Sequence, residues 1–179
     1  MGVGLLLLQC LYFMMPAYFG NMAPVMVKKH FKFLAIPIDG GRKLGGKPLF
    51  GRNKTWRGLI FGVLLGILTA FIQFKLNITS IHIIDYSNWL VFGALMGLGA
   101  ILGDLIESFV KRRLNRKPGQ KFVPWDQTDF VFGSVLLTYM YIPLIMRFNV
   151  ILTILIMSPL LHIAVNHLAF YTKIRNEKW

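Results

Sequence analysis

The sequence predicts an all-α protein that crosses a membrane five times. Of its 179 residues, 55% are hydrophobic, and the mean hydropathy of +0.58 lies above the averages of soluble domains. The apolar residues form five long runs, at about 3–27, 57–76, 88–110, 128–146 and 149–170. An α-helix needs roughly 20 mostly apolar residues to cross a bilayer. We therefore expect one integral membrane domain, 1–179, with five transmembrane helices.

The five runs differ in how cleanly they predict a helix. The first contains Pro16 and Pro24, so we expect a kink or a break there, because proline cannot donate the helical hydrogen bond. No positive residue precedes its apolar start, which favours a retained helix over a cleaved signal peptide. After Arg57 the second run is uncharged through Phe74, the third is apolar until Asp104, and a tight turn near 147–148 separates the last two.

The basic residues fall almost entirely on one side of this arrangement. Eight of the 20 lie in the loop 28–56, six in the loop 111–127 and three in the tail after 171, with Arg57 at the edge of the first loop. With five spans these segments share one side, and the positive-inside rule makes that side cytoplasmic. We therefore expect a multi-pass protein of the cell membrane with its N-terminus outside and its C-terminus in the cytoplasm.

The net charge of +13 allows two interpretations. Basic cytoplasmic loops can serve topology alone, and anionic membrane lipids attract them. For Lys28, Lys29, Lys32 and the tail, this interpretation is as good as a functional one. A soluble nucleic-acid-binding protein would not carry so many apolar runs, so we do not expect nucleic acid as a partner.

The acidic residues need a separate explanation. The chain has only seven, and four of them lie within 103–130: Asp104, Glu107, Asp126 and Asp129. Asp104 lies about two helical turns inside the end of the third predicted helix. A charge at mid-membrane costs roughly 2.5–3.5 kcal/mol on insertion scales. Some partner must therefore compensate for this carboxylate.

A polar stripe is expected on the third helix. If the helix continues through Arg112, positions i, i+3, i+4, i+7 and i+8 share one face, and they hold Asp104, Glu107, Ser108, Lys111 and Arg112. Pairing within the helix, Glu107 with Lys111 and Asp104 with Ser108, is one explanation, worth about 0.2–0.5 kcal/mol per pair in water. The other explanation is that the stripe is part of a site.

Asp126 and Asp129 stand at i, i+3 at the start of the fourth predicted helix. Helix capping would explain one acid there. Two acids, on the same side of the membrane as Asp104 and Glu107, indicate instead that the two acidic pairs converge. Converging carboxylates repel one another unless a cation lies between them, and oxygen ligands suit Mg²⁺. We predict that the four acids bind the metal ion and that neighbouring bases bind phosphate, as phosphoryl or nucleotidyl transfer requires.

A second cluster lies in the first basic loop, IPIDGGRKLGGKPLFGRNKTWRG, residues 36–58. Its six glycines allow tight turns and close approach to a ligand. Its six Lys and Arg side chains, its backbone amides and Thr55 at the start of the second helix form a plausible phosphate cradle. The spacing does not match a Walker motif, and a flexible connector is the alternative.

Two stretches resemble the signatures of the membrane CTP:phosphatidate cytidylyltransferases, or CDP-diacylglycerol synthases. The first resemblance is carried by Ser108-x-Val110-Lys111-Arg112-x₄-Lys117 followed by Asp126-x-x-Asp129. The second is carried by Asn53-Lys54-Thr55-Trp56 with Gly58, which is similar to the family's Lys-Lys-Thr-x-Glu-Gly segment.

The sequence also departs from this family pattern. Pro118 stands where the family has Asp after Lys, Gln127 replaces the Arg of Asp-Arg-x-Asp, Arg57 replaces the Glu, and the His-Gly-Gly is absent. With the short chain and the five predicted spans, these departures are most similar to the archaeal branch, the CDP-archaeol synthases. The missing aspartate removes one expected ligand of a second metal ion.

The resemblance implies an activity, substrates, a cofactor and site residues. It implies transfer of CMP from CTP to an unsaturated archaeal ether lipid phosphate, 2,3-bis-O-geranylgeranylglycerol 1-phosphate, giving CDP-archaeol and pyrophosphate with Mg²⁺. The implied catalytic residues are Asp104, Lys111, Asp126 and Asp129. The implied metal ligands are Asp104, Glu107, Asp126 and Asp129. The implied CTP contacts are Arg52, Asn53, Lys54, Thr55, Arg57, Ser108 and Arg112.

Other readings of the residues stay open. A small anion transporter or channel would also have a basic cytoplasmic vestibule, although its spans would need polar residues that the second and fifth runs mostly lack. A non-catalytic scaffold would hold anionic lipid and leave the four acids without a role. Close helix packing, including a homodimer, is allowed by Gly93, Gly97, Gly99 and Gly103. Lipid tails contact generic apolar surface, so diacylglycerol phosphate stays an alternative substrate.

Overall fold

The computed structural model describes residues 2–117, 120, 122–142 and 147–172. Within them the long helices are α1 (Val3–Met26), α2 (Trp56–Leu76), α3 (Trp89–Arg113), α4 (Trp125–Tyr141) and α5 (Phe148–Tyr171). The short elements are the 3-10 turns η1 (Lys32–Leu34), η2 (Thr79–Ile81) and η3 (Tyr86–Asn88) and the strands β1 (Lys43–Leu44) and β2 (Lys47–Pro48). Pro118, Lys121 and the basic tail residues lie outside the described residues.

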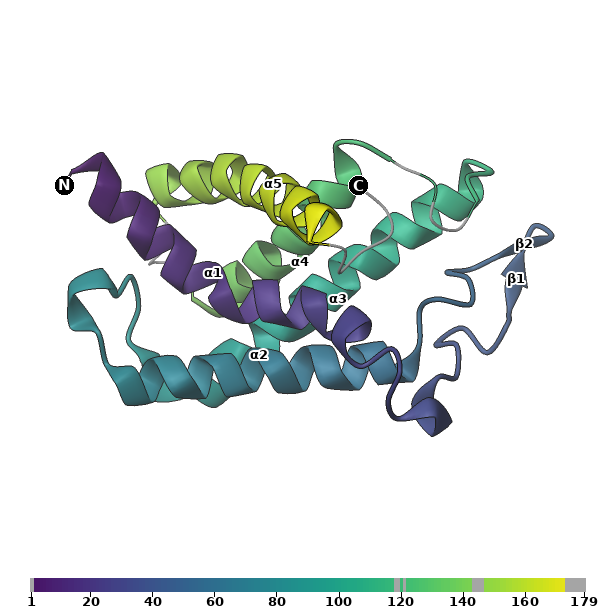
Figure 1. The fold of residues 1–179 in the computed structure, drawn as a ribbon, viewed down its shortest axis with the longest axis horizontal. Helices are drawn as coiled ribbons and strands as arrows, with labels where there is room; N and C mark the ends of the chain where they lie inside the picture. The colour runs from purple at the N-terminus through teal and green to yellow at the C-terminus, as the bar shows by residue number, and fades with distance from the viewer. Residues whose placement is uncertain (1, 118–119, 121, 143–146, 173–179) are drawn as a thin grey trace.

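The helices form one bundle in which α3 is central. α3 packs against α2 and α4, α1 lies across α2 and α3, and α5 contacts α4 and α1. Figure 1 shows the β1–β2 hairpin at one end of the bundle and the α2–α3 connection at the opposite end. The core between the helices is built from large apolar side chains such as Phe13, Phe92, Met96 and Phe130.

The predicted all-α fold is confirmed, and the predicted helix ends agree within three residues except at the end of the fourth run. Four segments among the described residues are long and apolar enough to cross a membrane: Val3–Met26, Trp56–Leu76, Tyr86–Arg113 and Phe148–Val165. α4 has 17 residues, which at about 1.5 Å each do not reach the roughly 30 Å of a hydrocarbon core. α4 ends at Tyr141, and residues 143–146 of the predicted run lie outside the described residues. The orientation stays a prediction.

Of the kink or break predicted in the first helix, the break does not occur, because α1 is continuous through Pro16 and Pro24. Pro16 is fully buried among the neighbouring side chains. The ring of Pro24 packs on α2, where it would lie 3.3 Å from a Cβ added at Gly58. Contacts with neighbouring helices compensate for the hydrogen bonds that proline removes, and the sequence pattern does not contain this information.

Glycines set the spacing of the three central helices. A Cβ added at Gly97 of α3 would lie 2.6 Å from the carbonyl oxygen of Gly62 in α2. On another face of α3, a Cβ at Gly99 would lie 2.6 Å from the carbonyl oxygen of Gly133 in α4, and one at Gly103 would overlap the carbonyl group of Asp129. α3 can therefore approach both neighbours this closely only with glycine at these positions.

The same glycines bear on the predicted homodimer. Gly93 and Gly97 meet α2, and Gly99 and Gly103 meet α4, so all four pack within one chain. They therefore lend no support to a dimer interface, and the homodimer stays a prediction.

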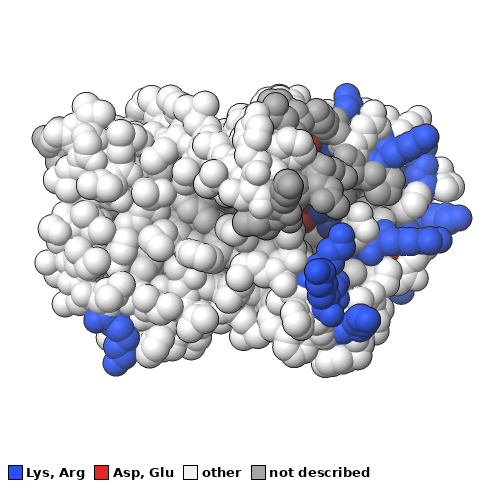
Figure 2. Space-filling view, viewed as in Figure 1, with Lys and Arg blue, Asp and Glu red and all other residues white. Residues whose placement is uncertain are grey.

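Charge is distributed as unevenly in space as it is along the chain. Figure 2 shows Lys and Arg gathered at the end of the molecule that carries the hairpin, with a second small basic patch at the far end. Among the described residues, the rest of that face is free of Lys and Arg, which leaves a broad uncharged surface of the kind that faces lipid.

Gly103→Ala is expected to destabilise the protein, because the added Cβ overlaps the Asp129 carbonyl group and forces α3 and α4 apart. Overpacking of this kind costs about 1–3 kcal/mol, and thermal unfolding in detergent followed by helical circular dichroism measures it. Gly4→Ala is the matched control, since nothing lies within 4 Å of a Cβ there. Equal unfolding temperatures for the two variants would contradict the packing argument.

Candidate active site

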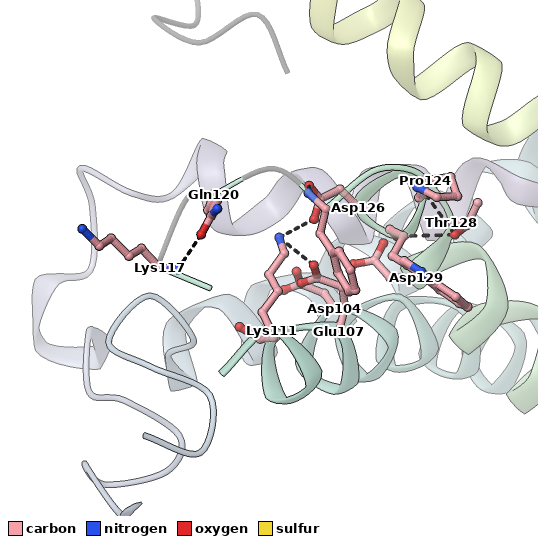
Figure 3. A network of polar contacts seen from close by, with 12 residues as sticks. Asp104, Glu107, Lys111, Lys117, Gln120, Pro124, Asp126, Thr128 and Asp129 are labelled. Atoms are coloured by element: carbon pink, nitrogen blue, oxygen red, sulfur yellow. Dashed lines mark hydrogen bonds and ion pairs between the residues drawn. The ribbon is translucent and has the colours of Figure 1, made fainter. Parts of the chain in front are cut away.

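Three carboxylates meet where α3 and α4 approach each other. One oxygen from each of Asp104, Glu107 and Asp129 lies within 4.8 Å of the others, and Figure 3 shows the side chains grouped between the two helices. The i, i+3 spacing puts Asp104 and Glu107 on one face of α3, and the contact at Gly103 brings Asp129 to them. The structure thus brings together three of the four acids that the sequence singled out.

Two lysines lie against these acids. The Lys54 ammonium, from the glycine-rich loop, lies 2.5 Å from Asp104 Oδ1. Lys111 forms ion pairs with Glu107 and with Asp126. Glu107 and Lys111 therefore form the intrahelical pair that the sequence allowed, whereas Asp104 pairs across the site with Lys54 rather than with Ser108. Two lysines face four carboxylates, so the cluster is negative when all four are ionised.

Asp126 is placed differently from the other three acids. One of its oxygens pairs with Lys111, and the other accepts a hydrogen bond from the backbone N–H of Phe122 at 2.7 Å. Figure 3 shows the Lys111 ammonium reaching both Asp126 and Glu107. This carboxylate therefore anchors both the start of α4 and the lysine, and its predicted role as a metal ligand stays a prediction.

The glycine-rich loop is ordered around Asp39, which the sequence analysis did not single out. Its carboxylate is 7% exposed and accepts hydrogen bonds from the backbone N–H groups of Gly41, Phe50 and Gly51 at 2.9, 3.0 and 3.2 Å. Burial alone would raise the pKa of Asp39, but these donors outweigh it and lower the pKa. An Asp directly before two glycines is typical of a side-chain-closed turn, which is the signal that could have found it.

The loop is also fixed to α3. Lys47 Nζ donates to the Arg113 carbonyl oxygen at 3.0 Å, and the Arg113 guanidinium donates back to the carbonyl oxygens of Leu44, Lys47 and Pro48. Ser108 Oγ donates to the Phe50 carbonyl oxygen at 3.0 Å. Ser108, a predicted CTP contact, thus binds the loop backbone, and Arg113 was not predicted at all.

The remaining predicted CTP contacts take different positions. Thr55 caps α2, its Oγ1 accepting from the Gly58 N–H at 3.3 Å. Arg57 is buried and donates to the carbonyl oxygens of Lys28 and His30, both at 2.9 Å. Arg112 is buried on α3, and its Nε has no hydrogen-bond partner among the described residues.

A cleft of about 60 Å³ opens beside the acid cluster. Its polar wall consists of Asn53, Lys54, Thr55 and Asp104. Its apolar wall comes from α1, α2 and α3 and includes Pro24, Leu59 and Ile101. Arg52 is exposed next to it in the chain. Residues 53–55 and Asp104, far apart in sequence, therefore face one space that has a charged side and a lipid-like side.

Comparison with known proteins identifies the family. The family model described as "CarS-like: CDP-archaeol synthase" matches residues 3–179. The chain belongs to the CarS-like family of CDP-archaeol synthases. The resemblance read from the two motifs is therefore confirmed, and the chain is a multi-pass membrane transferase of lipid biosynthesis. The transporter alternative has no support.

Relatives match over nearly their whole length. The CDP-archaeol synthase of Methanosphaerula palustris is 35% identical and covers 93% of this chain and 100% of its own. The CDP-archaeol synthase of Pyrococcus furiosus is 35% identical, and the match covers 97% of this chain and 98% of that protein. A solved structure of an intramembrane enzyme for archaeal membrane lipids biosynthesis aligns with a TM-score of 0.71 and 28% identity over 87% of this chain and 90% of its own.

Asp39→Asn is expected to loosen the glycine-rich loop, because a neutral amide accepts more weakly from the three N–H groups. Faster amide hydrogen exchange across 39–51, measured by mass spectrometry, would report it. Asp85→Asn, at the opposite end of the bundle, is the control and should leave this exchange unchanged.

The pH dependence of the same group has a definite sign. The folded-state pKa of Asp39 is lowered, so its stabilisation is complete above the unfolded pKa of about 3.9 and is lost as the pH falls through the folded pKa. The difference in unfolding free energy between wild type and Asp39→Asn should shrink below about pH 4, and a constant difference would contradict this role.

Proposed function

We propose that this chain transfers CMP from CTP to an unsaturated archaeal ether lipid phosphate and uses Mg²⁺ in doing so. An oxygen of the lipid phosphate attacks the α-phosphorus of CTP in line, and the bond to the β-phosphate breaks as pyrophosphate leaves. The attacking oxygen is already anionic, so no general base is required. The observation that carries the proposal is the set of three carboxylate oxygens within 4.8 Å, beside a cleft, in a chain of this family.

The side chains present fit a hard divalent cation. All three candidate ligands are carboxylates, the donor type that Mg²⁺ prefers. Glu107 Oε1 pairs with Lys111 at 2.6 Å, so a bound cation would share this buried carboxylate with the lysine. Asp104, Glu107 and Asp129 would hold the ion, which would supply neutralisation of the triphosphate charge.

The lysines and the loop have roles that follow from their positions. Lys54 and Lys111 lie at the acid cluster and can donate to the phosphate oxygens of CTP. Asn53 and Thr55 line the same cleft and can contact the nucleotide. Asp126 holds Lys111 in place. We retain these five as functional residues, with Asp126 acting through the lysine.

The other predicted CTP contacts divide into two groups. Arg52 is exposed and Arg112 has an unpartnered buried Nε among the described residues, so both keep a proposed role in binding the triphosphate. Ser108 and Arg57 donate to backbone carbonyl oxygens, and we assign them to holding the loops around the cleft. The hairpin end is proposed to face the cytoplasm, where its basic residues are favoured.

Asp129→Asn is expected to lower kcat/KM by roughly 10²-fold or more, because one charged group that stabilises the transition state is lost. Formation of CDP-lipid and pyrophosphate from CTP in detergent micelles measures it. Asp85→Asn is the isosteric control far from the site and should keep wild-type turnover. Wild-type turnover in Asp129→Asn would remove this carboxylate from the mechanism.

Calorimetric titration tests the ion separately from turnover. CTP should bind wild type at least roughly tenfold more tightly with Mg²⁺ than without it, because the ion joins the triphosphate to the carboxylates and neutralises their repulsion. Asp104→Asn should abolish that difference, whereas Asp126→Asn should preserve it and lower kcat through the displaced Lys111. Equal CTP affinity with and without Mg²⁺ would exclude this ion site.

A further inference from the structure

The segment that follows α1 carries features that the proposed chemistry does not use. Residues 28–36, here called the anchor segment, contain η1 and three lysines, Lys28, Lys29 and Lys32. Phe31 and Phe33 lie between or beside these lysines and are 47% and 72% exposed. The three lysines are exposed as well, so the segment exposes cations and large aromatic rings within a few residues of one another.

The charges of the anchor segment are not neutralised within the described protein. None of its three lysines forms an ion pair with a described acidic residue. The chain has no acidic residue at all before Asp39. An anion from outside the chain would therefore meet three unpaired ammonium groups.

The backbone holds this surface in an unusual shape. Phe31 adopts φ 49°, in the left-handed region that a bulky residue rarely enters. The centroid of its ring lies 4.5 Å from the centroid of the Phe61 ring on α2 and 6.4 Å from that of the Phe33 ring. Strain of this kind persists only where the surroundings enforce it, and the contact with Phe61 holds Phe31 against α2.

The anchor segment is tied to the wall of the cleft. Arg57 donates to the carbonyl oxygens of Lys28 and His30, and the Trp56 N–H donates to the Ile36 carbonyl oxygen at 3.0 Å. The residues on either side of this pair, Thr55 and Gly58, line the cleft. A ligand on the anchor segment would lie next to the cleft mouth.

The composition of the segment fits a lipid headgroup layer. It directly follows a helix long and apolar enough to cross a membrane, so it starts at the level of the headgroups. Aromatic rings favour that level, and lysines near it attract anionic lipid at short range. Free nucleotide offers phosphate but no apolar surface for the exposed rings.

We propose that the anchor segment is a docking surface for phosphate-bearing lipid headgroups, which concentrates the lipid substrate beside the cleft. The use of that lipid rests on the proposed function, whereas the docking itself does not. The lysines bind the headgroup phosphate, the two phenylalanines insert among the chains, and Arg57 keeps the surface next to the cleft.

The test compares two charge variants of the full-length protein. Lys28→Gln/Lys29→Gln/Lys32→Gln removes the docking charges, and Lys75→Gln/Arg147→Gln is the control that removes basic residues outside the basic loops. In vesicles of zwitterionic lipid with a varied fraction of lipid phosphate, the triple variant should show a KM for the lipid raised roughly tenfold. Its kcat at saturating lipid and its KM for CTP should equal those of wild type.

Competition separates docking from a general effect on the protein. A non-substrate anionic lipid should raise the apparent lipid KM of wild type and of the control double variant, but not that of the triple variant. Phe33→Ser should raise the lipid KM as well, whereas Phe148→Ser, a similarly exposed ring on α5, should not. An unchanged lipid KM in the triple variant would overturn the proposal.

Native mass spectrometry keeps docking and catalysis distinguishable. Wild type released from detergent should retain a dialkylglycerol phosphate that the triple variant loses, with no CTP present. Retention without any turnover of CTP would overturn the proposed function and leave docking intact. Turnover with equal retention by both proteins would overturn docking and leave the proposed function intact.

Discussion

The contact between α3 and α4 is the constraint on which the site depends. Gly99, Gly103 and Gly133 remove the side chains that would hold the two backbones apart. Asp104 follows Gly103 directly, and Asp129 supplies the carbonyl group against which Gly103 packs. The close contact between the two helices therefore also brings the two carboxylates together. Like charges brought together near a membrane repel strongly because little water screens them. The packing energy of the bundle holds the acids in an arrangement that a cation or a lysine must balance.

The glycine-rich loop supplies positive charge to the acid cluster, and side-chain hydrogen bonds to its backbone hold it in place. Asp39 closes its turns by accepting three backbone N–H groups, and Arg113 fastens the hairpin to α3 by donating to three carbonyl oxygens. The Asp39 carboxylate and the terminal nitrogens of Arg113 thus bond the protein backbone. Lys54 is thereby carried to Asp104, and the loop residues before α2 face the cleft. Because the loop is already ordered, ligand binding does not have to offset the conformational entropy lost when a flexible loop becomes fixed.

Particular residues show where reasoning from sequence reached its limit. The spacing of Asp104 and Glu107 placed them on one helical face, and the intrahelical pair of Glu107 with Lys111 followed from i, i+4 geometry. The partner of Asp104 was not predictable, because Lys54 lies fifty residues away and nothing local connects them. The resemblance implied CTP contacts for Ser108 and Arg57, which stay predictions, and it could not show that both side chains donate to backbone carbonyl groups. Pro16 and Pro24 predicted a kink or a break, and α1 runs through both without a break.

The sequence by itself determined the helical fold, the approximate ends of the helices, the family and the identity of the acidic and basic residues that gather at one end. These follow from local rules: apolar length, helical period and motif spacing act within one segment and need no knowledge of its neighbours. Only the tertiary structure decided that Asp126 turns to Lys111 and Phe122, that Asp39 organises the loop, and that Asp104 pairs with Lys54. Those outcomes depend on how closely separate helices pack, a distance set by contacts between residues that are remote along the chain.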